Sequence, residues 1–198
     1  MNNQVLSIVL PTTFDRRKTF YPLLEFILRQ INNMDLSREI EVLIDEDNKE
    51  KSIGQKRQDL LQRANGKYIV GIDSDDWISD DYIKKIYKAI TNNPEVDHIG
   101  FYEKCNIDGD ITKSIFSIKY LKWHENLDGY DHIRCANPKS VIKREIAIKV
   151  GFEDIRYGED RIFSEKVTPL LSTEIFIDDM LYYYRRINSE HNHRYGII

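Results

Sequence analysis

The chain has 198 residues, of which 41% are hydrophobic and 31% are charged, and its formal net charge is −4. This length and composition predict one globular domain with its own core and argue against a disordered chain. The mildly acidic charge gives no general attraction to nucleic acid or to anionic membranes, so neither is an expected partner.

Cysteine usage and the N-terminal sequence indicate the compartment. Cys105 and Cys135 do not form a CxxC pair, which predicts two reduced, partly buried thiols and no redox or zinc site. Residues 1–4 lead directly into an apolar run and lack the basic start of a signal peptide. No apolar run approaches the roughly 20 residues that a membrane span needs. We therefore expect a cytoplasmic protein without a transmembrane segment.

The first hundred residues alternate between short apolar runs and amphipathic segments. The predicted strands are 5–10, 41–45, 68–72 and 96–101, and the predicted helices are 19–31, 52–64 and 80–90. Gly66 is expected to cap the second helix, and Ser79 and Asp80 are expected to cap the third. Alternating strands and helices predict a parallel sheet with right-handed crossovers.

The second half is less regular. A turn over 107–110 is predicted to join strands 102–105 and 111–118 into a hairpin. Further on, we expect a strand over 140–143, a short helix that Gly151 ends, a helix over 160–167, and late strands over 175–177 and 181–184. Because no repeat or linker interrupts the chain, we expect a single domain over residues 1–198.

Each of the first three predicted strands ends in polar residues. The stretches are Pro11-Thr12-Thr13, Asp45-Glu46-Asp47 and Asp73-Ser74-Asp75-Asp76. Ligands of open α/β sheets bind outside the carboxyl ends of the strands, so these side chains are expected to converge on one site.

The run Asp73-Ser74-Asp75-Asp76 places three carboxylates within four residues. Like charges held together disfavour each other's ionisation, and a divalent cation removes that conflict. Mg²⁺ and Mn²⁺ prefer oxygen ligands of this kind. A solvated turn that caps the next helix is the alternative. We favour a metal site for Asp73 and Asp75.

Two later segments add weaker signals. Tyr157-Gly158-Glu159-Asp160-Arg161 places an acidic pair at the start of a helix, a pattern that simple helix capping also explains. The segment from Tyr182 to Arg194 is locally basic and could face a diphosphate. Its His191 and His193 are candidate metal or phosphate ligands, and they could equally face solvent.

Taken in chain order, these stretches resemble family 2 of the glycosyltransferases. The resemblance rests on Ser7–Thr13, Glu41–Asp45, Gly54–Arg57, Asn65–Ile69, Asp73–Asp76 and Gly158–Asp160. It implies the A-type glycosyltransferase fold, which is a Rossmann-like, mostly parallel sheet flanked by helices with a small acceptor-side β elaboration. Residues 1–100 would be the nucleotide-binding half, and residues 101–198 would bind the acceptor and supply the catalytic base.

The resemblance also implies roles for single residues. The donor-binding residues would be Pro11, Thr12, Thr13, Arg17, Asp45, Arg57, Asp73 and Ser74. Asp75, with Asp73 and Asp76, would hold Mn²⁺ or Mg²⁺, and Asp160 with Glu159 would be catalytic. The implied reaction moves a sugar, with inversion, from a nucleoside diphosphate (UDP by expectation) to a hydroxyl acceptor such as a glycan. From the segment 101–138, Trp123, His124 and Asn137 are candidate acceptor contacts.

The chain departs from the family pattern in two ways, and other functions stay open. Its second strand ends in Asp45-Glu46-Asp47-Asn48 instead of an Asp-Asp-Gly-Ser-like turn, and a Gln-x-x-Arg-Trp motif is missing, which favours single transfers. A nucleotidyltransferase is disfavoured because Pro11 to Asp15 contains no glycine. A non-catalytic sugar-nucleotide-binding protein and a transferase acting on modified DNA remain as alternatives.

Overall fold

The predicted strands of the first half form the parallel part of a mixed sheet in the computed structural model, which describes residues 4–186. Strand β1 (Leu6–Thr13) lies between β2 (Ile40–Asp47) and β3 (Tyr68–Gly71) and runs parallel to both. The order across the sheet is β2-β1-β3-β9-β5-β6-β8-β7, and β10 pairs with β5 and with β4. The remaining strands are β4 (Trp77–Ile78), β5 (His98–Ile107), β6 (Asp110–Phe116), β7 (His124–Leu127), β8 (Tyr130–Arg134), β9 (Val141–Lys143) and β10 (Glu174–Arg186).

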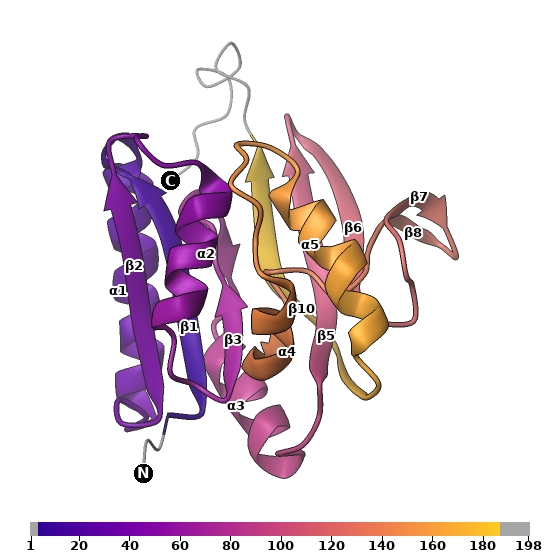
Figure 1. Ribbon diagram of the computed structural model, residues 1–198, viewed down its shortest axis with the longest axis horizontal. Helices are drawn as coiled ribbons and strands as arrows, with labels where there is room; N and C mark the ends of the chain where they lie inside the picture. The colour runs from indigo at the N-terminus through magenta and orange to yellow at the C-terminus, as the bar shows by residue number, and fades with distance from the viewer. Residues whose placement is uncertain (1–3, 187–198) are drawn as a thin grey trace.

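Helices cover both faces of the sheet, which confirms the expected α/β fold (Figure 1). One face carries α1 (Arg17–Asn33) and α3 (Tyr82–Asn92). The other carries α2 (Ile53–Arg63), α4 (Arg144–Val150) and α5 (Glu159–Val167). Short 3-10 turns, η1 (Phe14–Arg16) and η2 (Thr168–Leu170), precede α1 and follow α5.

The apolar run of β1 fills both cores because successive side chains of a strand point to opposite faces. Leu6, Ile8 and Leu10 pack with the residues of α1 and α3, whereas Val9 packs with those of α2, α4 and α5. The strand is therefore buried on both sides, as a near-continuous apolar run predicts.

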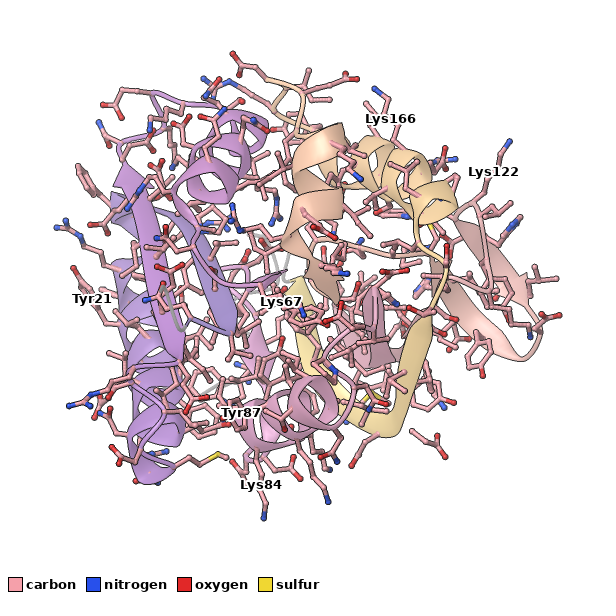
Figure 2. The ribbon with its side chains drawn as sticks, turned by 60° about the horizontal axis from the view of Figure 1, so that its bottom comes forward. Tyr21, Lys67, Lys84, Tyr87, Lys122 and Lys166 are labelled. Carbon is pink, nitrogen blue, oxygen red and sulfur yellow. The ribbon has the colours of Figure 1, made fainter. Side chains whose placement is uncertain are left out.

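The predicted hairpin of the second half is present. Ile107 pairs with Asp110, and the two residues between them, Asp108 and Gly109, both have positive φ, at 53° and 98°. Strand β7 and its partner β8, which were not predicted, form a second hairpin beyond β6 that stands out at the side of the molecule (Figure 1). Figure 2 shows Lys122, just ahead of β7, at the opposite side of the molecule from Tyr21 of α1.

The predicted helix caps are wrong at two places. Helix α2 ends at Arg63 with Ala64 as its C-cap, so Gly66 is not a cap. Gly66 instead lies against β1, where an added Cβ would come within 2.5 Å of the Ser7 backbone nitrogen. This contact explains the glycine, since no larger residue fits so close to a backbone.

The third helix also begins differently from the prediction. Its N-cap is Asp81, whose side chain accepts no hydrogen bond from the helix backbone. The Asp81 carboxylate instead accepts a hydrogen bond from Ser79 Oγ at 2.9 Å and pairs with Lys85 at 2.6 Å. Neither Ser79 nor Asp80 caps the helix.

The two late strands are one continuous strand. β10 runs parallel to β5 over its whole length, with two shifts of register between Phe176 and Tyr182. A prediction from local apolar runs divided it because the acidic pair Asp178-Asp179 interrupts the pattern.

Two further expectations concern the cysteines and membrane spans. Cys105 and Cys135 are both free, as predicted, and both are more deeply buried than expected. Burial is the main cause that raises the pKa of the Cys105 thiol to about 12 and that of Cys135 to about 11. Among the helices of residues 4–186, none combines the length and apolar character that a bilayer crossing requires.

Candidate functional site

A cavity of about 440 Å³ lies where β1 and β3 end and where α2 and α5 begin, at the upper end of the sheet in Figure 1. Its volume is typical of sites for small molecules. The sequence-predicted residues that line it are Pro11, Thr12, Thr13, Arg57, Asp73, Asp75, Glu159 and Asp160. The structure thus brings together residues that are up to about 150 positions apart in the chain.

Arg57 connects two walls of the cavity. It projects from α2 and is 5% exposed. Its Nη2 donates to Asp73 Oδ1 at 2.7 Å, and its Nε donates to Glu159 Oε1 at 3.2 Å. A buried guanidinium between two carboxylates fixes the end of β3 relative to the start of α5.

The charges around Arg57 shift the pKa values of its partners in opposite directions. Burial alone would raise the pKa of Asp73, but Arg57, and then Lys139, outweigh it and hold that pKa below its usual range. For Glu159 burial dominates over Arg57, and with the charge of Asp160 it raises the pKa. Asp73 is therefore the more firmly ionised of the two carboxylates.

Asp75 is the carboxylate of the acidic run that is best placed for a cation. Its side chain is 44% exposed, lines the cavity and pairs with Arg16 at 3.0 Å. Burial, with a contribution from Asp73, raises its pKa, so a positive charge at this position would be stabilising. Mg²⁺ bound to nucleotides usually takes one or two carboxylates together with phosphate oxygens and waters, and Asp75 fits that donor set.

The other two aspartates of the predicted metal site are held by other groups. Asp73 is bound to Arg57, as described above. Asp76 is 4% exposed and does not line the cavity; its oxygens accept hydrogen bonds from Tyr182 Oη at 2.8 Å and from the Arg185 backbone at 3.0 Å. Burial raises its pKa well above the usual range. Within residues 4–186, no three acidic, histidine or cysteine side chains are grouped to hold an ion.

The acidic pair at the start of α5 divides into a buried and a more accessible member. Glu159 is 5% exposed and faces Arg57. Asp160 is half-buried, and its Oδ1 accepts a hydrogen bond from the Arg161 backbone at 2.8 Å. Gly158, with φ of 81°, turns the chain into the helix just before this pair. Within residues 4–186, the other oxygen of the Asp160 carboxylate has no hydrogen-bond partner, so it can act on a ligand in the cavity.

The cavity is rich in cations although the chain is acidic. Its cationic lining residues are Arg16, Lys49, Lys51, Lys56, Arg57, Lys139 and Arg156. They outnumber its four lining carboxylates, so the cavity favours an anionic ligand. Arg156 pairs with no carboxylate of residues 4–186 and donates only to the backbone oxygens of Lys49 and Glu50.

Two buried polar atoms near the cavity have no hydrogen-bond partner among the described residues. They are Thr12 Oγ1 and Arg57 Nη1. Buried polar atoms are nearly always paired in folded proteins, so each indicates a missing partner such as a ligand or water.

Three of the predicted donor-binding residues do not line the cavity. Arg17 forms a two-pronged pair with Glu46 at 3.0 and 2.9 Å. Asp45 is buried and pairs with Lys51, which does line the cavity. Ser74 is buried, and its Oγ lies 3.5 Å from Arg16 Nη1.

The predicted acceptor residues lie away from the cavity lining. Trp123 stacks under Arg134, whose guanidinium lies 4.4 Å from the ring centre, and His124 is exposed on β7. Asn137 is 1% exposed and holds a turn, accepting a hydrogen bond from the Lys139 backbone at 3.0 Å. His191 and His193 lie outside the described residues.

Several lining residues were not predicted. Lys56 could have been found because it precedes Arg57 in a stretch that already carried the family resemblance, and Tyr157 and Gly158 were part of the second motif. Tyr184 lies in the segment from Tyr182 to Arg194 that was expected to face a diphosphate, whereas for Lys139 the sequence offers no comparable signal. They reach the cavity only because β9 and β10 join the sheet beside β3 and β5.

Comparisons with known proteins find glycosyltransferases. The family model for glycosyl transferase family 2 matches residues 27–151. Among curated proteins, the glycosyltransferase GlyG of Streptococcus pneumoniae is 26% identical over 190 residues, which are 85% of this chain and 63% of GlyG. GlyA of the same organism is 27% identical over 137 residues, which are 63% of this chain and 20% of GlyA.

Solved structures share the fold. S. aureus TarS 1–349 in complex with UDP-GlcNAc matches with a TM-score of 0.65 and 16% identity, over 98% of this chain and 62% of that one. The mannosyltransferase PcManGT from Pyrobaculum calidifontis, in complex with GDP-Man and Mn²⁺, matches with a TM-score of 0.53 and 13% identity, over 90% of this chain and 56% of that one.

Proposed function

This chain is a member of glycosyltransferase family 2, and on that basis we propose that it transfers a sugar from a UDP-linked donor to a hydroxyl group of a glycan or glycoconjugate. The observation that carries the proposal is the cavity in which Asp160 of α5 shares the lining with Asp73 and Asp75 beyond β3, among seven cations. The fold shared with a UDP-GlcNAc complex supports UDP as the carrier.

Asp160 is our candidate for the catalytic base. A hydroxyl group is a weak nucleophile at neutral pH, and a carboxylate within hydrogen-bond reach can take its proton as attack proceeds. The acceptor oxygen then attacks the anomeric carbon on the side opposite the diphosphate, so the configuration inverts. Glu159 acts differently: its contact with Arg57 at 3.2 Å makes it a positioning residue for that guanidinium.

Asp75 would hold Mn²⁺ or Mg²⁺, and the donor diphosphate is proposed to lie beside it. A bound divalent cation would offset the negative charge that develops on the leaving diphosphate. Arg16 and Arg156 add fixed positive charge at the same cavity, and Arg156 is free of a carboxylate partner within residues 4–186. Thr12 Oγ1, buried without a partner among those residues, is proposed to bond the nucleotide.

The test is calorimetric titration of wild-type protein with UDP, GDP and dTDP and with the sugars linked to each of these nucleotides. Each titration is done with and without Mn²⁺. We expect tight, metal-dependent binding of UDP that Asp75→Ala abolishes. The matched control is Asp131→Ala, because Asp131 lies on β8 outside the cavity lining. Binding of no nucleotide would overturn the proposal, and binding without sugar transfer to any hydroxyl acceptor would favour the non-catalytic alternative.

A further inference from the structure

Lys139 is a buried lysine at the cavity to which the proposed function gives no role. It comes from the turn before β9, its side chain is 11% exposed, and it lines the cavity. Its Nζ lies 2.5 Å from Glu103 Oε2 and 4.9 and 4.6 Å from the ring centres of Tyr182 and Tyr184. Lysine is rarely buried in proteins, so this placement needs a reason.

The turn that carries Lys139 is held from two sides. On one side, the Gly71 backbone nitrogen at the end of β3 donates to Pro138 O at 2.7 Å. On the other, the Asn137 backbone nitrogen donates to Ser140 Oγ at 3.0 Å. These bonds fix the Lys139 backbone next to the strand that leads into Asp73.

A buried chain of polar groups supports the second side of the turn. Ser140 Oγ lies 2.7 Å from His98 Nε2, and His98 Nδ1 lies 2.8 Å from Glu174 Oε2. Glu174 in turn accepts hydrogen bonds from Ser117 Oγ and from the Ile118 backbone, each at 2.8 Å. Because a fully satisfied buried network is rigid, the position of Lys139 is set in advance of ligand binding.

The Lys139 ammonium has donors to spare. Of its three N–H groups, one is directed to Glu103, and residues 4–186 supply no other hydrogen-bond acceptor to Nζ. Burial would lower its pKa, but Glu103, Asp76 and Asp73 outweigh burial and raise it, so the group is charged at neutral pH. The remaining N–H groups face a cavity, where they can donate to oxygen acceptors of a ligand.

The other buried cations of the cavity are more fully occupied. Lys56 contacts both Asp47 and the Thr12 carbonyl oxygen, and Arg57 contacts Asp73 and Glu159. Among the described residues, Lys139 is thus the buried cation there whose charged group has a single hydrogen-bond partner. An anionic oxygen bonds to an ammonium more strongly than a neutral hydroxyl does, so a phosphate is the better complement than a sugar hydroxyl.

We propose that Lys139 binds the donor's diphosphate through a phosphate oxygen, and that Ser140, His98 and Glu174 position the turn that presents it. The proposal rests on the proposed function, because it requires that the cavity receives a nucleoside diphosphate. Lys139 is then a donor-binding residue, and the three supporting residues act through it.

Two substitutions that break the same ion pair test this assignment. Lys139→Met removes the ammonium, whereas Glu103→Gln keeps it and removes only its carboxylate partner. We expect Lys139→Met to weaken UDP binding by about 10- to 100-fold in calorimetry, the range for losing a hydrogen bond to a charged group. Glu103→Gln should leave UDP affinity within about threefold of wild type or strengthen it, since the positive charge is then less neutralised.

Lys67→Met is the matched control. Lys67 also pairs with a glutamate, Glu95 at 2.7 Å, but it lies just before β3, at the end of that strand opposite to the cavity. It should leave UDP affinity unchanged. Uridine, measured by displacement, should bind Lys139→Met as well as it binds wild type, because uridine has no phosphate.

The outcomes separate the two proposals. If wild type binds UDP and Lys139→Met binds it equally well, the assignment of Lys139 is overturned while the proposed function stands. If Lys139→Met and Glu103→Gln weaken UDP binding equally, or if Lys139→Met loses affinity for uridine as well as for UDP, Lys139 has a structural role. Either result would also overturn its assignment to the diphosphate. A loss confined to UDP-sugar, with UDP unaffected, would assign Lys139 to the sugar and overturn the phosphate contact. If wild type binds no nucleoside diphosphate, both proposals fail together.

Discussion

The sheet is built differently near β1 and β3 and at the β7–β8 hairpin. On its packed side, around β1 and β3, the strands are buried on both faces, and the cavity residues are fixed by buried ion pairs of Lys56 and Arg57. At the other side, β7 is exposed along its whole length, and the hairpin of β7 and β8 rests on a small cluster of Ile115, Tyr120 and Ile133.

This difference separates two tasks within one sheet. A site that must hold charged groups in register needs a rigid support, and the packed side supplies it. A hairpin with little core of its own can change its surface without moving the cavity. Four substitutions test that separation, from the largest expected effect to the smallest.

Asp160→Asn should have the largest effect. If Asp160 is the base, the change lowers the rate of sugar transfer by about 10²- to 10⁴-fold, the usual contribution of a general base. The dissociation constant for UDP should stay within about threefold of wild type, because the amide keeps the shape of the carboxylate. Glu165→Gln on the same helix, where Glu165 pairs with Arg161, is the control. Transfer at the wild-type rate by Asp160→Asn would refute the assignment.

Arg57→Met should have the largest effect on stability. It leaves Asp73 and the buried Glu159 without their shared cation, and breaking a buried pair costs about 3–5 kcal/mol. Urea unfolding followed by circular dichroism measures the difference. Arg63→Met, at the exposed end of the same helix, should cost less than about 0.5 kcal/mol. Similar losses in both variants would mean that the packed side does not depend on this pair.

Glu174→Gln tests the contacts that join the packed side of the sheet to the strands that carry the β7–β8 hairpin. Glu174 joins β10 to His98 of β5 and to the segment after β6. Replacing the carboxylate should lower the free energy of unfolding at pH 7 by about 1.5–3 kcal/mol, the value of a hydrogen bond to a charged group.

The loss should depend on pH with a defined sign. Burial would raise the pKa of Glu174, but His98 and the hydrogen-bond donors around it lower that pKa in the folded state. Its contribution is therefore present above the unfolded value of about 4.3 and disappears as the pH falls through the lower folded value. The curves of wild type and Glu174→Gln should converge in acid. Glu145→Gln, an exposed change, should follow wild type at every pH.

His124→Ala should have the smallest effect. His124 is exposed on β7, so its removal should change the free energy of unfolding by less than about 0.5 kcal/mol. The affinity for UDP should be unchanged, because His124 does not line the cavity. A clear loss of UDP binding would show that the hairpin and the cavity are coupled after all.

The sequence predicts the packed side of the molecule well for a physical reason. Strands buried on both faces read as continuous apolar runs, and the polar residues that end them mark the edge where ligands bind. Thr12 and Asp73 could therefore be assigned to one site from the strand pattern. Arg57 and Asp160 were assigned to it through the family resemblance, and all four residues line the cavity.

The features that the sequence did not predict depend on contacts between distant segments of the chain. The exposed residues of β7 show no apolar alternation, so periodicity could not reveal that strand. Asp76 reads like Asp73 and Asp75, and only its hydrogen bond with Tyr182, 106 positions later, shows that it faces away from the cavity. From the sequence, Lys139 would be taken for a surface lysine, and only its ion pair with Glu103 in the folded chain shows that it is buried.

Because β10 changes register against β5, the number of residues in β10 decides which face of the sheet its later side chains occupy. The offset between paired residues of β10 and β5 changes from 76 at Glu174 and His98 to 79 at Tyr182 and Glu103. Because side chains alternate between faces with a period of two, an odd number of extra residues exchanges the face that each later residue occupies. Tyr182 owes its place against Asp76 to this count. The segment 177–181 thus works as a spacer, so deletion of one residue from it would disturb the cavity more than substitution of any one of its side chains.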